Sequence, residues 1–247
     1  MATLISLVKN RAWILPHWLQ AIRRLGVDRY IFLDDASTDG SRAMLAHFAV
    51  DVPNTTVLVN DVPFADNTSS RVDRNRLDLY HHLARLRNIT LDAAAGADRV
   101  LSLDSDILPV PTLLAALARH QRPYVATLIN NVRTIHPRDC EKTEWNDATN
   151  ILVKSGTGFH HLRPVPLNSL IPCDLSGACM LLQGEALPAR FGFHGCGEDG
   201  GHALDLSRLG VPICADTTPR AVHCYAEKDL PQALRTLAYL SSTEESL

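Results

Sequence analysis

The sequence predicts an α/β fold with a mainly parallel central sheet flanked by helices. Apolar segments of strand length alternate with segments whose apolar residues recur at helical spacing, and this alternation is typical of parallel sheets. Several apolar segments end abruptly in carboxylates, as a buried strand does where the chain leaves the sheet. The 247 residues, 46% of them hydrophobic, match one domain of this kind.

The first half of the chain carries five strand signals and four helix signals in alternation. Strands are expected over residues 4–8, 29–33, 56–60, 100–104 and 124–128, and helices over residues 16–25, 41–48, 74–95 and 112–120. In the first helix, Pro16 suits the first turn, and Trp18 and Ile22 belong to one apolar face. Right-handed crossovers between parallel strands then place helices on both faces of the sheet.

The second half departs from this rhythm. Residues 130–172 are polar, contain prolines and lack periodicity, so we expect a long functional insertion that shapes a binding pocket. Strands are expected over residues 178–182, 211–214 and 220–223, with a helix that starts near Glu198. A helix over residues 230–240 and frayed residues 241–247 are expected to close the chain.

Composition excludes several classes of function. The net charge is −3 and no basic block occurs, so nucleic acid is not an expected partner. No apolar stretch reaches the roughly 18 residues of a membrane span, and the amino terminus lacks a signal-peptide pattern. We therefore expect a cytoplasmic protein, with peripheral membrane contact left open. The six cysteines show no C-x-x-C spacing, which favours reduced thiols over a zinc site or disulfides.

The most informative motif is L-S-L-D-S-D-I, in which Asp104 and Asp106 follow an apolar run. In open α/β sheets, ligands bind at the carboxyl ends of the strands. Two carboxylates at that edge suit Mg²⁺ or Mn²⁺ holding a diphosphate, because such ions are bound by one or two carboxylates plus substrate phosphates. The alternative is a surface turn in which Asp and Ser bond to nearby backbone.

Two further polar segments are expected at the same edge. Asp34 and Asp35 end the second strand, where a carboxylate can accept hydrogen bonds from a nucleobase or ribose; the alternative is a helix-capping loop. Lys9, Asn10 and Arg11 follow the first strand, where cations can meet phosphate or simply lie at the surface.

Later in the chain, the segment G-C-G-E-D-G-G places Glu198 and Asp199 at a helix start, whose dipole favours ionised carboxylates. Flanking glycines would let a substrate approach closely, and a charged helix cap is the alternative. His223 ends the apolar segment A-V-H-C-Y and is either a hydrogen-bonded core residue or a ligand.

Taken in order, these motifs resemble a known family. The motifs span residues from about 3 to 225. They are V-K-N-R, L-D-D-A-S-T-D-G-S, R-N-I-T-L-D-A-A, L-S-L-D-S-D-I, L-S-G-A-C-M-L, G-E-D-G-G and the late histidine His223. The chain resembles the nucleotide-sugar-dependent glycosyltransferases of the GT-A fold, and is most similar to the family 2 group.

The resemblance implies roles for the donor side of the site. Asp35 would contact the base of the donor nucleotide, with Asp34 nearby. Asp104 and Asp106 match the D-x-D motif that holds a divalent ion against the diphosphate and contacts the ribose, and His223 matches a histidine that completes the metal ligands. An imidazole beside carboxylates favours Mn²⁺, with Mg²⁺ as the alternative.

The resemblance also implies roles near the sugar and the acceptor. Gly177 matches a glycine loop beside the donor sugar, and Arg87 matches a basic or polar group near the donor. Glu198 and Asp199 match an acidic pair near the acceptor, in which Asp199 would be the general base and Glu198 would bind hydroxyls.

The implied activity is metal-dependent transfer of a sugar from a UDP- or GDP-linked donor to an acceptor hydroxyl, with inversion if Asp199 is the base. No Q-x-x-R-W segment follows the acidic pair, so a non-processive enzyme is expected, acting on a carbohydrate, lipid-linked, peptide or small-molecule acceptor. Residues 1–128 would form the nucleotide-binding half of a single domain, residues 129–225 the acceptor-binding half and residues 226–247 a terminal helix and tail.

The sequence bears differently on four alternative functions. A retaining transferase of the same fold can carry a similar acidic pair. A sugar nucleotidyltransferase would need a Gly-rich basic loop after the first strand, and V-K-N-R-A-W has no glycine. A non-catalytic carbohydrate-binding module is disfavoured by the full set of acids. A phosphatase would carry its D-x-D at the first strand, whereas here the motif follows the fourth.

Overall fold

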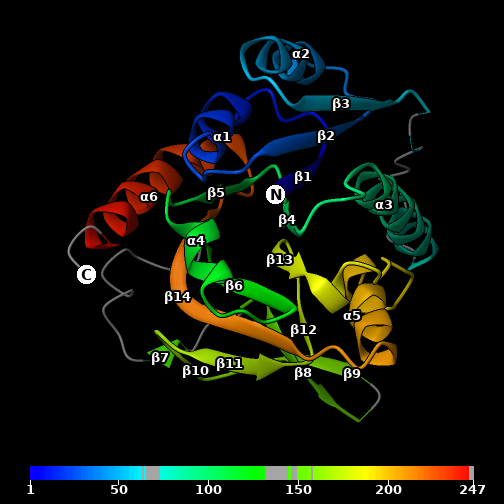
Figure 1. The fold of residues 1–247 in the computed structure, drawn as a ribbon, viewed down its shortest axis with the longest axis vertical. Helices are drawn as coiled ribbons and strands as arrows, with labels where there is room; N and C mark the ends of the chain where they lie inside the picture. Colours follow the sequence, from blue (N-terminus) through cyan, green and yellow to red (C-terminus); the bar gives the residue numbers. More distant parts are fainter. Residues whose placement is uncertain (63, 65–72, 132–143, 146–148, 157, 245–247) are drawn as a thin grey trace.

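The computed structural model describes residues 1–62, 64, 73–131, 144–145, 149–156 and 158–244. A large central sheet has the strand order β11-β14-β6-β13-β4-β1-β2-β3, and β5 pairs with β14 beside it (Figure 1). Helices cover both faces, so the sequence-based prediction of an α/β fold with helices on both sides of a mainly parallel sheet is confirmed.

The amino-terminal part is wholly parallel. Its strands are β1 (Ala2–Val8), β2 (Arg29–Asp35), β3 (Thr55–Asn60) and β4 (Arg99–Leu103), with β1 between β2 and β4. The connecting helices are α1 (Leu15–Ile22), α2 (Ser41–Asp51) and α3 (Asp73–Ala93). Because the four strands run in one direction, their carboxyl ends meet at one edge of the sheet.

The remaining strands make the sheet mixed. Strand β13 (Cys179–Gln183) lies antiparallel between β4 and β6 (Tyr124–Asn131), and β14 (Ile213–His223) runs parallel to β6. Strands β5 (Ile107–Pro109) and β11 (Leu170–Cys173) pair antiparallel with β14. The strand expected over residues 124–128 thus has the expected direction, but β13 separates it from β4.

Two apolar cores lie on opposite faces of the sheet. One face is covered by α1, α2, α4 (Leu113–Ala118) and α6 (Leu230–Glu244), whose apolar side chains share a cluster with Trp18 and Phe32. The other face is covered by α3 and α5 (Glu198–Arg208), which pack with Ile5 and Ile31. Since helices α3 and α5 share one face, they bring distant segments of the chain together beside the carboxyl ends of β1, β2 and β4 (Figure 1).

Three expectations about the second half were wrong. Strands were expected over residues 211–214 and 220–223, but β14 begins at Ile213 and runs without a break to His223. Its register shifts between Asp216 and Ala221, so the polar interruption is a bulge and not a loop. The described part of residues 130–172 forms short strands and not one long loop. These strands are too short for an alternation of apolar and polar residues to be visible in the sequence. Helix α6 continues through residues 241–244, which were expected to fray. The short strands are β7 (Glu144–Trp145), β8 (Ile151–Ser155), β9 (Gly158–His161), β10 (Val165–Pro166), β11 and, just beyond, β12 (Leu175–Ser176).

Two short 3₁₀ helices complete the secondary structure, at Gly184–Ala186 and Glu227–Asp229. The five cysteines of the described ranges are all free thiols, while Cys140 and most of the polar connection over residues 61–73 lie outside those ranges. Within the described part of the chain, no helix has the length and apolarity that crossing a membrane requires.

Candidate active site

A cleft with a volume of about 280 Å³ opens at the carboxyl ends of β1, β2 and β4. Its walls come from these strand ends, from α3 and from the start of α5. The lining residues are Leu7, Val8, Lys9, Arg11, Asp35, Phe64, Leu79, Leu83, Arg87, Asp104, Ser105, Asp106 and Glu198. The cleft therefore gathers basic and acidic side chains that are up to about 190 residues apart in sequence.

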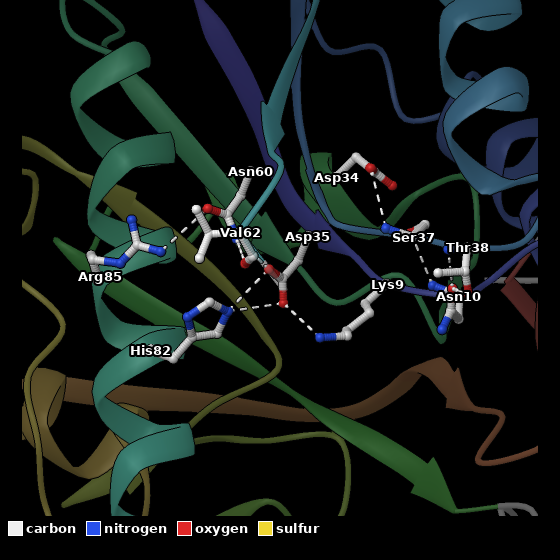
Figure 2. A network of polar contacts seen from close by, with 10 residues as sticks. All are labelled: Lys9, Asn10, Asp34, Asp35, Ser37, Thr38, Asn60, Val62, His82 and Arg85. Atoms are coloured by element: carbon white, nitrogen blue, oxygen red, sulfur yellow. Dashed lines mark hydrogen bonds and ion pairs between the residues drawn. The ribbon is translucent and has the colours of Figure 1, made fainter. Parts of the chain in front are cut away.

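Asp35 lines this cleft and is surrounded by hydrogen-bond donors. His82 Nε2 is 3.0 Å from each carboxylate oxygen, Asn60 Nδ2 donates over 2.7 Å and Lys9 Nζ lies at 3.3 Å (Figure 2). Burial acts to raise the pKa of Asp35, but the hydrogen bonds from His82 and Asn60 and the nearby charges outweigh it, so the pKa lies below its ordinary value. Asp35 is therefore ionised at neutral pH.

Asp34 points away from the cleft, because successive residues of a strand face opposite sides of the sheet. It is fully buried, and its Oδ2 accepts a hydrogen bond from Arg42 Nε over 2.8 Å. The same oxygen accepts a hydrogen bond from the Ser37 amide over 3.4 Å (Figure 2). These contacts tie the loop after β2 to the start of α2. The structure thus separates the two neighbouring aspartates, and only Asp35 lines the cleft.

The residues that follow β1 also differ in whether they line the cleft. Asn10 has a positive φ of 51°, and its Oδ1 accepts a hydrogen bond from the Thr38 amide over 2.8 Å, so its side chain joins two loops and does not line the cleft. Arg11 does line it, and its Nη2 donates to Asp106 Oδ2 over 2.9 Å. The Nε atom of Arg11 is buried and has no hydrogen-bond partner among the described residues.

Asp106 and His223 meet where β5 pairs with the end of β14. His223 Nε2 lies 3.7 Å from Asp106 Oδ1, whereas Asp104 accepts a hydrogen bond from Arg87 Nη2 over 2.8 Å. Burial raises the pKa of Asp104. For Asp106, the hydrogen bond and charge of His223, together with Arg11, outweigh burial and hold the pKa below its ordinary value. The two carboxylates of the motif thus differ in environment.

Asp106 and His223 are the candidate ligands of a divalent ion. In the described ranges, no three His, Cys, Asp or Glu side chains are already arranged around one point. The 3.7 Å between His223 Nε2 and Asp106 Oδ1 is within the span of two ligands that each lie about 2.1 Å from one ion. Mg²⁺ and Mn²⁺ commonly take one or two protein carboxylates and draw their other ligands from phosphate and water. The pair therefore fits such an ion.

Arg87 connects the two sides of the cleft. It is 6% exposed, and its Nε donates to Glu198 Oε1 over 3.1 Å while Nη2 donates to Asp104. Burial acts to lower the pKa of Arg87, but Asp104 and Glu198 raise it well above the ordinary value, so the guanidinium stays charged. Arg87 is thus engaged by carboxylates from both sides.

Asp199 follows Glu198 at the start of α5 but does not line the cleft. Burial raises its pKa to about 7, and its Oδ1 atom has no hydrogen-bond partner among the described residues. A Cβ added at Gly177 would overlap the Asp199 carboxylate, so only glycine leaves room for it. The loop that contains Gly177 is therefore in direct contact with the acidic pair. The order of the two segments along the chain gave no sign of this contact.

Sequence reasoning missed His82 and Asn60, which hold Asp35. His82 lies on the expected long helix between the apolar residues Leu79 and Leu83, which also line the cleft. A polar residue on the inner face of a helix was the available signal. Nothing local in the sequence indicated which strand end it would meet.

No known protein-family profile matches the sequence, and no curated protein matches it. Solved structures do match. TarS from S. aureus in complex with UDP is 13% identical, covers 97% of this chain and 64% of its own, and has a TM-score of 0.56. The mannosyltransferase PcManGT from Pyrobaculum calidifontis in complex with GDP-Man and Mn²⁺ is 18% identical, covers 100% and 64%, and has a TM-score of 0.55.

Glucosyl-3-phosphoglycerate synthase from Mycobacterium tuberculosis, in complex with Mn²⁺, UDP and glucosyl-3-phosphoglycerate, is 16% identical. It covers 98% of this chain and 79% of its own, with a TM-score of 0.51. The chain spans less than two thirds of the length of TarS and PcManGT. At these identities the similarity concerns the fold alone, and the chain shares the GT-A-type fold of these three structures.

Proposed function

We propose that the chain is a metal-dependent glycosyltransferase that moves a sugar from a nucleoside-diphosphate sugar to an acceptor hydroxyl. The observation that carries this proposal is the shared cleft, in which Asp35, Asp106 and Glu198 converge from three distant segments. Structures with the same fold hold UDP, GDP-Man and Mn²⁺, which supports a donor of this class.

Asp106 and His223 would hold the divalent ion, with Asp104 as a third ligand once its carboxylate turns from Arg87. The ion supplies electrostatic stabilisation of the negative charge that develops on the leaving diphosphate. Arg11 is suited to hydrogen-bond a phosphate oxygen, because its guanidinium lines the cleft and is partly exposed beside Asp106.

On the acceptor side, Asp199 would accept the proton of the attacking hydroxyl from its place beside Gly177, just outside the lining of the cleft. A pKa of about 7 suits this role, because a general base works best when its pKa lies near the operating pH. Glu198, held by Arg87, would bind sugar or acceptor hydroxyls. Direct attack assisted by Asp199 inverts the anomeric centre.

Gly177→Ala tests the placement of this base. The new Cβ would displace the Asp199 carboxylate, and we expect transfer to slow by about a hundredfold, since a 1 Å misplacement can cost that much. Gly195→Ala is the matched control, because a Cβ there meets no atom within 4 Å. Equal transfer rates in the two variants would contradict the proposed role of the loop.

We further propose that the donor base is uracil. Asp35 offers acceptors, and donors from Lys9 and His82 lie on two sides of it (Figure 2). The uracil edge complements this arrangement, because N3–H donates and the flanking carbonyl oxygens accept. The guanine edge has two donors and one acceptor, and cytosine N3 has no proton to donate.

Calorimetry with UDP, GDP and CDP tests the reaction class and the base together. We expect UDP to bind in the presence of Mn²⁺ and to bind at least about tenfold tighter than CDP or GDP, since an unpaired buried polar group costs that much or more. Tighter binding of GDP would overturn only the choice of base. If no nucleoside diphosphate binds with Mn²⁺, the proposed function is wrong.

A further inference from the structure

The Arg87 guanidinium is the only described group that hydrogen-bonds carboxylates on both sides of the cleft, and it does so from a nearly solvent-free position. A charged side chain with several rotatable bonds loses much conformational freedom when it is held there. Besides these two ion pairs, an aromatic ring contacts the guanidinium.

Phe191 packs against Arg87. The centroid of its ring lies 5.3 Å from Arg87 Cζ, and the residue is 3% exposed. Its backbone is bound to the neighbour of Arg87 on α3, because the Phe191 amide donates to Asn88 Oδ1 and Asn88 Nδ2 donates to the Phe191 carbonyl, both over 2.9 Å. Asn88 therefore holds the Phe191 backbone beside α3, and this places the Phe191 ring against the side chain of the preceding residue, Arg87.

The Phe191 ring in turn stacks on His202. The two centroids are 4.2 Å apart, the planes differ by 12° and His202 is 1% exposed. His202 lies on α5, one turn after the acidic pair. The stack thus links Arg87 on α3 to the helix that carries its partner Glu198.

Two glycines let α5 approach this layer closely. A Cβ at Gly201 would overlap the Gly192 carbonyl, and a Cβ at Gly200 would lie 2.8 Å from His194 Nδ1. The first turn of α5 therefore presses directly on the backbone that follows Phe191. Gly200 and Gly201 of the segment G-E-D-G-G thus allow α5 to pack closely against the backbone of residues 192–194. The sequence suggested only that these glycines would let a substrate approach.

We infer that Phe191 and His202 form a stacked platform that positions the Arg87 guanidinium between Asp104 and Glu198. They are positioning residues, since they act through Arg87 and line no part of the cleft. The platform concerns packing around the site, so it goes beyond the proposed sugar transfer and is testable without a substrate.

The test is the exchange rate of the Arg87 Nε–H proton, measured by ¹H–¹⁵N NMR on the full chain and assigned by its absence in Arg87→Lys. We expect Phe191→Leu to speed exchange at least about tenfold, because the bond to Glu198 opens more often. Phe48→Leu is a matched control: Phe48 is also buried, and its ring also lies beneath an arginine, with Arg23 Cζ 4.8 Å from the centroid. We expect no change in this control.

A second pair of variants keeps the inference testable if Phe191→Leu does not fold. His202→Phe retains a planar ring in the stack, whereas His202→Leu removes it. We expect slow exchange in the first variant and fast exchange in the second. Equal exchange in these two variants, or an equal acceleration in Phe48→Leu and Phe191→Leu, would overturn the inference, because the effect would then report general loosening of the core.

Discussion

Asp199→Asn is expected to lower the rate of sugar transfer at least about a hundredfold while nucleotide binding stays near normal. Asparagine preserves the volume beside Gly177 but cannot accept the proton of the acceptor hydroxyl. Steady-state transfer rates and calorimetry with UDP and Mn²⁺ separate the two effects. Asp92→Asn, a change in an exposed carboxylate on α3, is the control.

The pH dependence of the transfer rate should also show that Asp199 is the base. Burial raises the pKa of Asp199 to about 7, and only the ionised form is a base. The wild-type rate should therefore rise from about pH 6 to about pH 8, and the residual rate of Asp199→Asn should be flat over this range. A rate near that of the wild type would remove Asp199 as the base.

The raised pKa of Asp199 also predicts that the stability of the fold depends on pH. Stability should fall as the pH rises, whereas the transfer rate should increase. The folded protein binds this proton with a pKa of about 7, and the unfolded chain with the ordinary value of 3.8. The stabilisation from the protonated form is thus present at low pH and is lost as the pH rises from about 4 to about 7. The Tm of Asp199→Asn should exceed that of the wild type by more at about pH 8 than at about pH 5.

Asp106→Ala is expected to abolish the Mn²⁺-dependent part of nucleotide binding. The change removes the carboxylate that lies beside His223 and leaves Arg11 without its partner. The loss of UDP affinity in Mn²⁺ should exceed the 10–100-fold that loss of an outer-shell group typically costs. Calorimetry with and without Mn²⁺ measures it, and without metal the variant should bind UDP at least as tightly as the wild type, because Arg11 keeps its charge.

Asp51→Ala is the control for this variant, because Asp51 also pairs with an arginine, Arg23, but lies on α2 outside the cleft. Asp104→Ala and His223→Ala should weaken metal-dependent binding in the same direction. If Asp106→Ala keeps the full response to Mn²⁺, the carboxylate does not hold the ion and the proposed metal site is wrong.

Most of the fold could be predicted from sequence because its signals are local. The apolar runs of β1 to β4 and the amphipathic pattern of α1 each lie within a few residues, and the strand ends that carry Asp35 and Asp104 follow directly. Strand β14 was divided in error, since the polar residues between Asp216 and Ala221 look like a loop when the partner strand is unknown. The placement of β13 between β4 and β6 likewise depends on pairing with distant segments.

The residue types at the carboxyl ends of the strands follow from the sequence alone, because a buried strand tolerates charge only where it leaves the sheet. The pairing of these groups is visible only in the folded chain: Asp35 pairs with His82, Asp106 with His223, and Arg87 with carboxylates from both sides of the cleft. The reason is that such pairs depend on helix positions and burial, and these arise only when α3, α5 and β14 close on the same edge of the sheet.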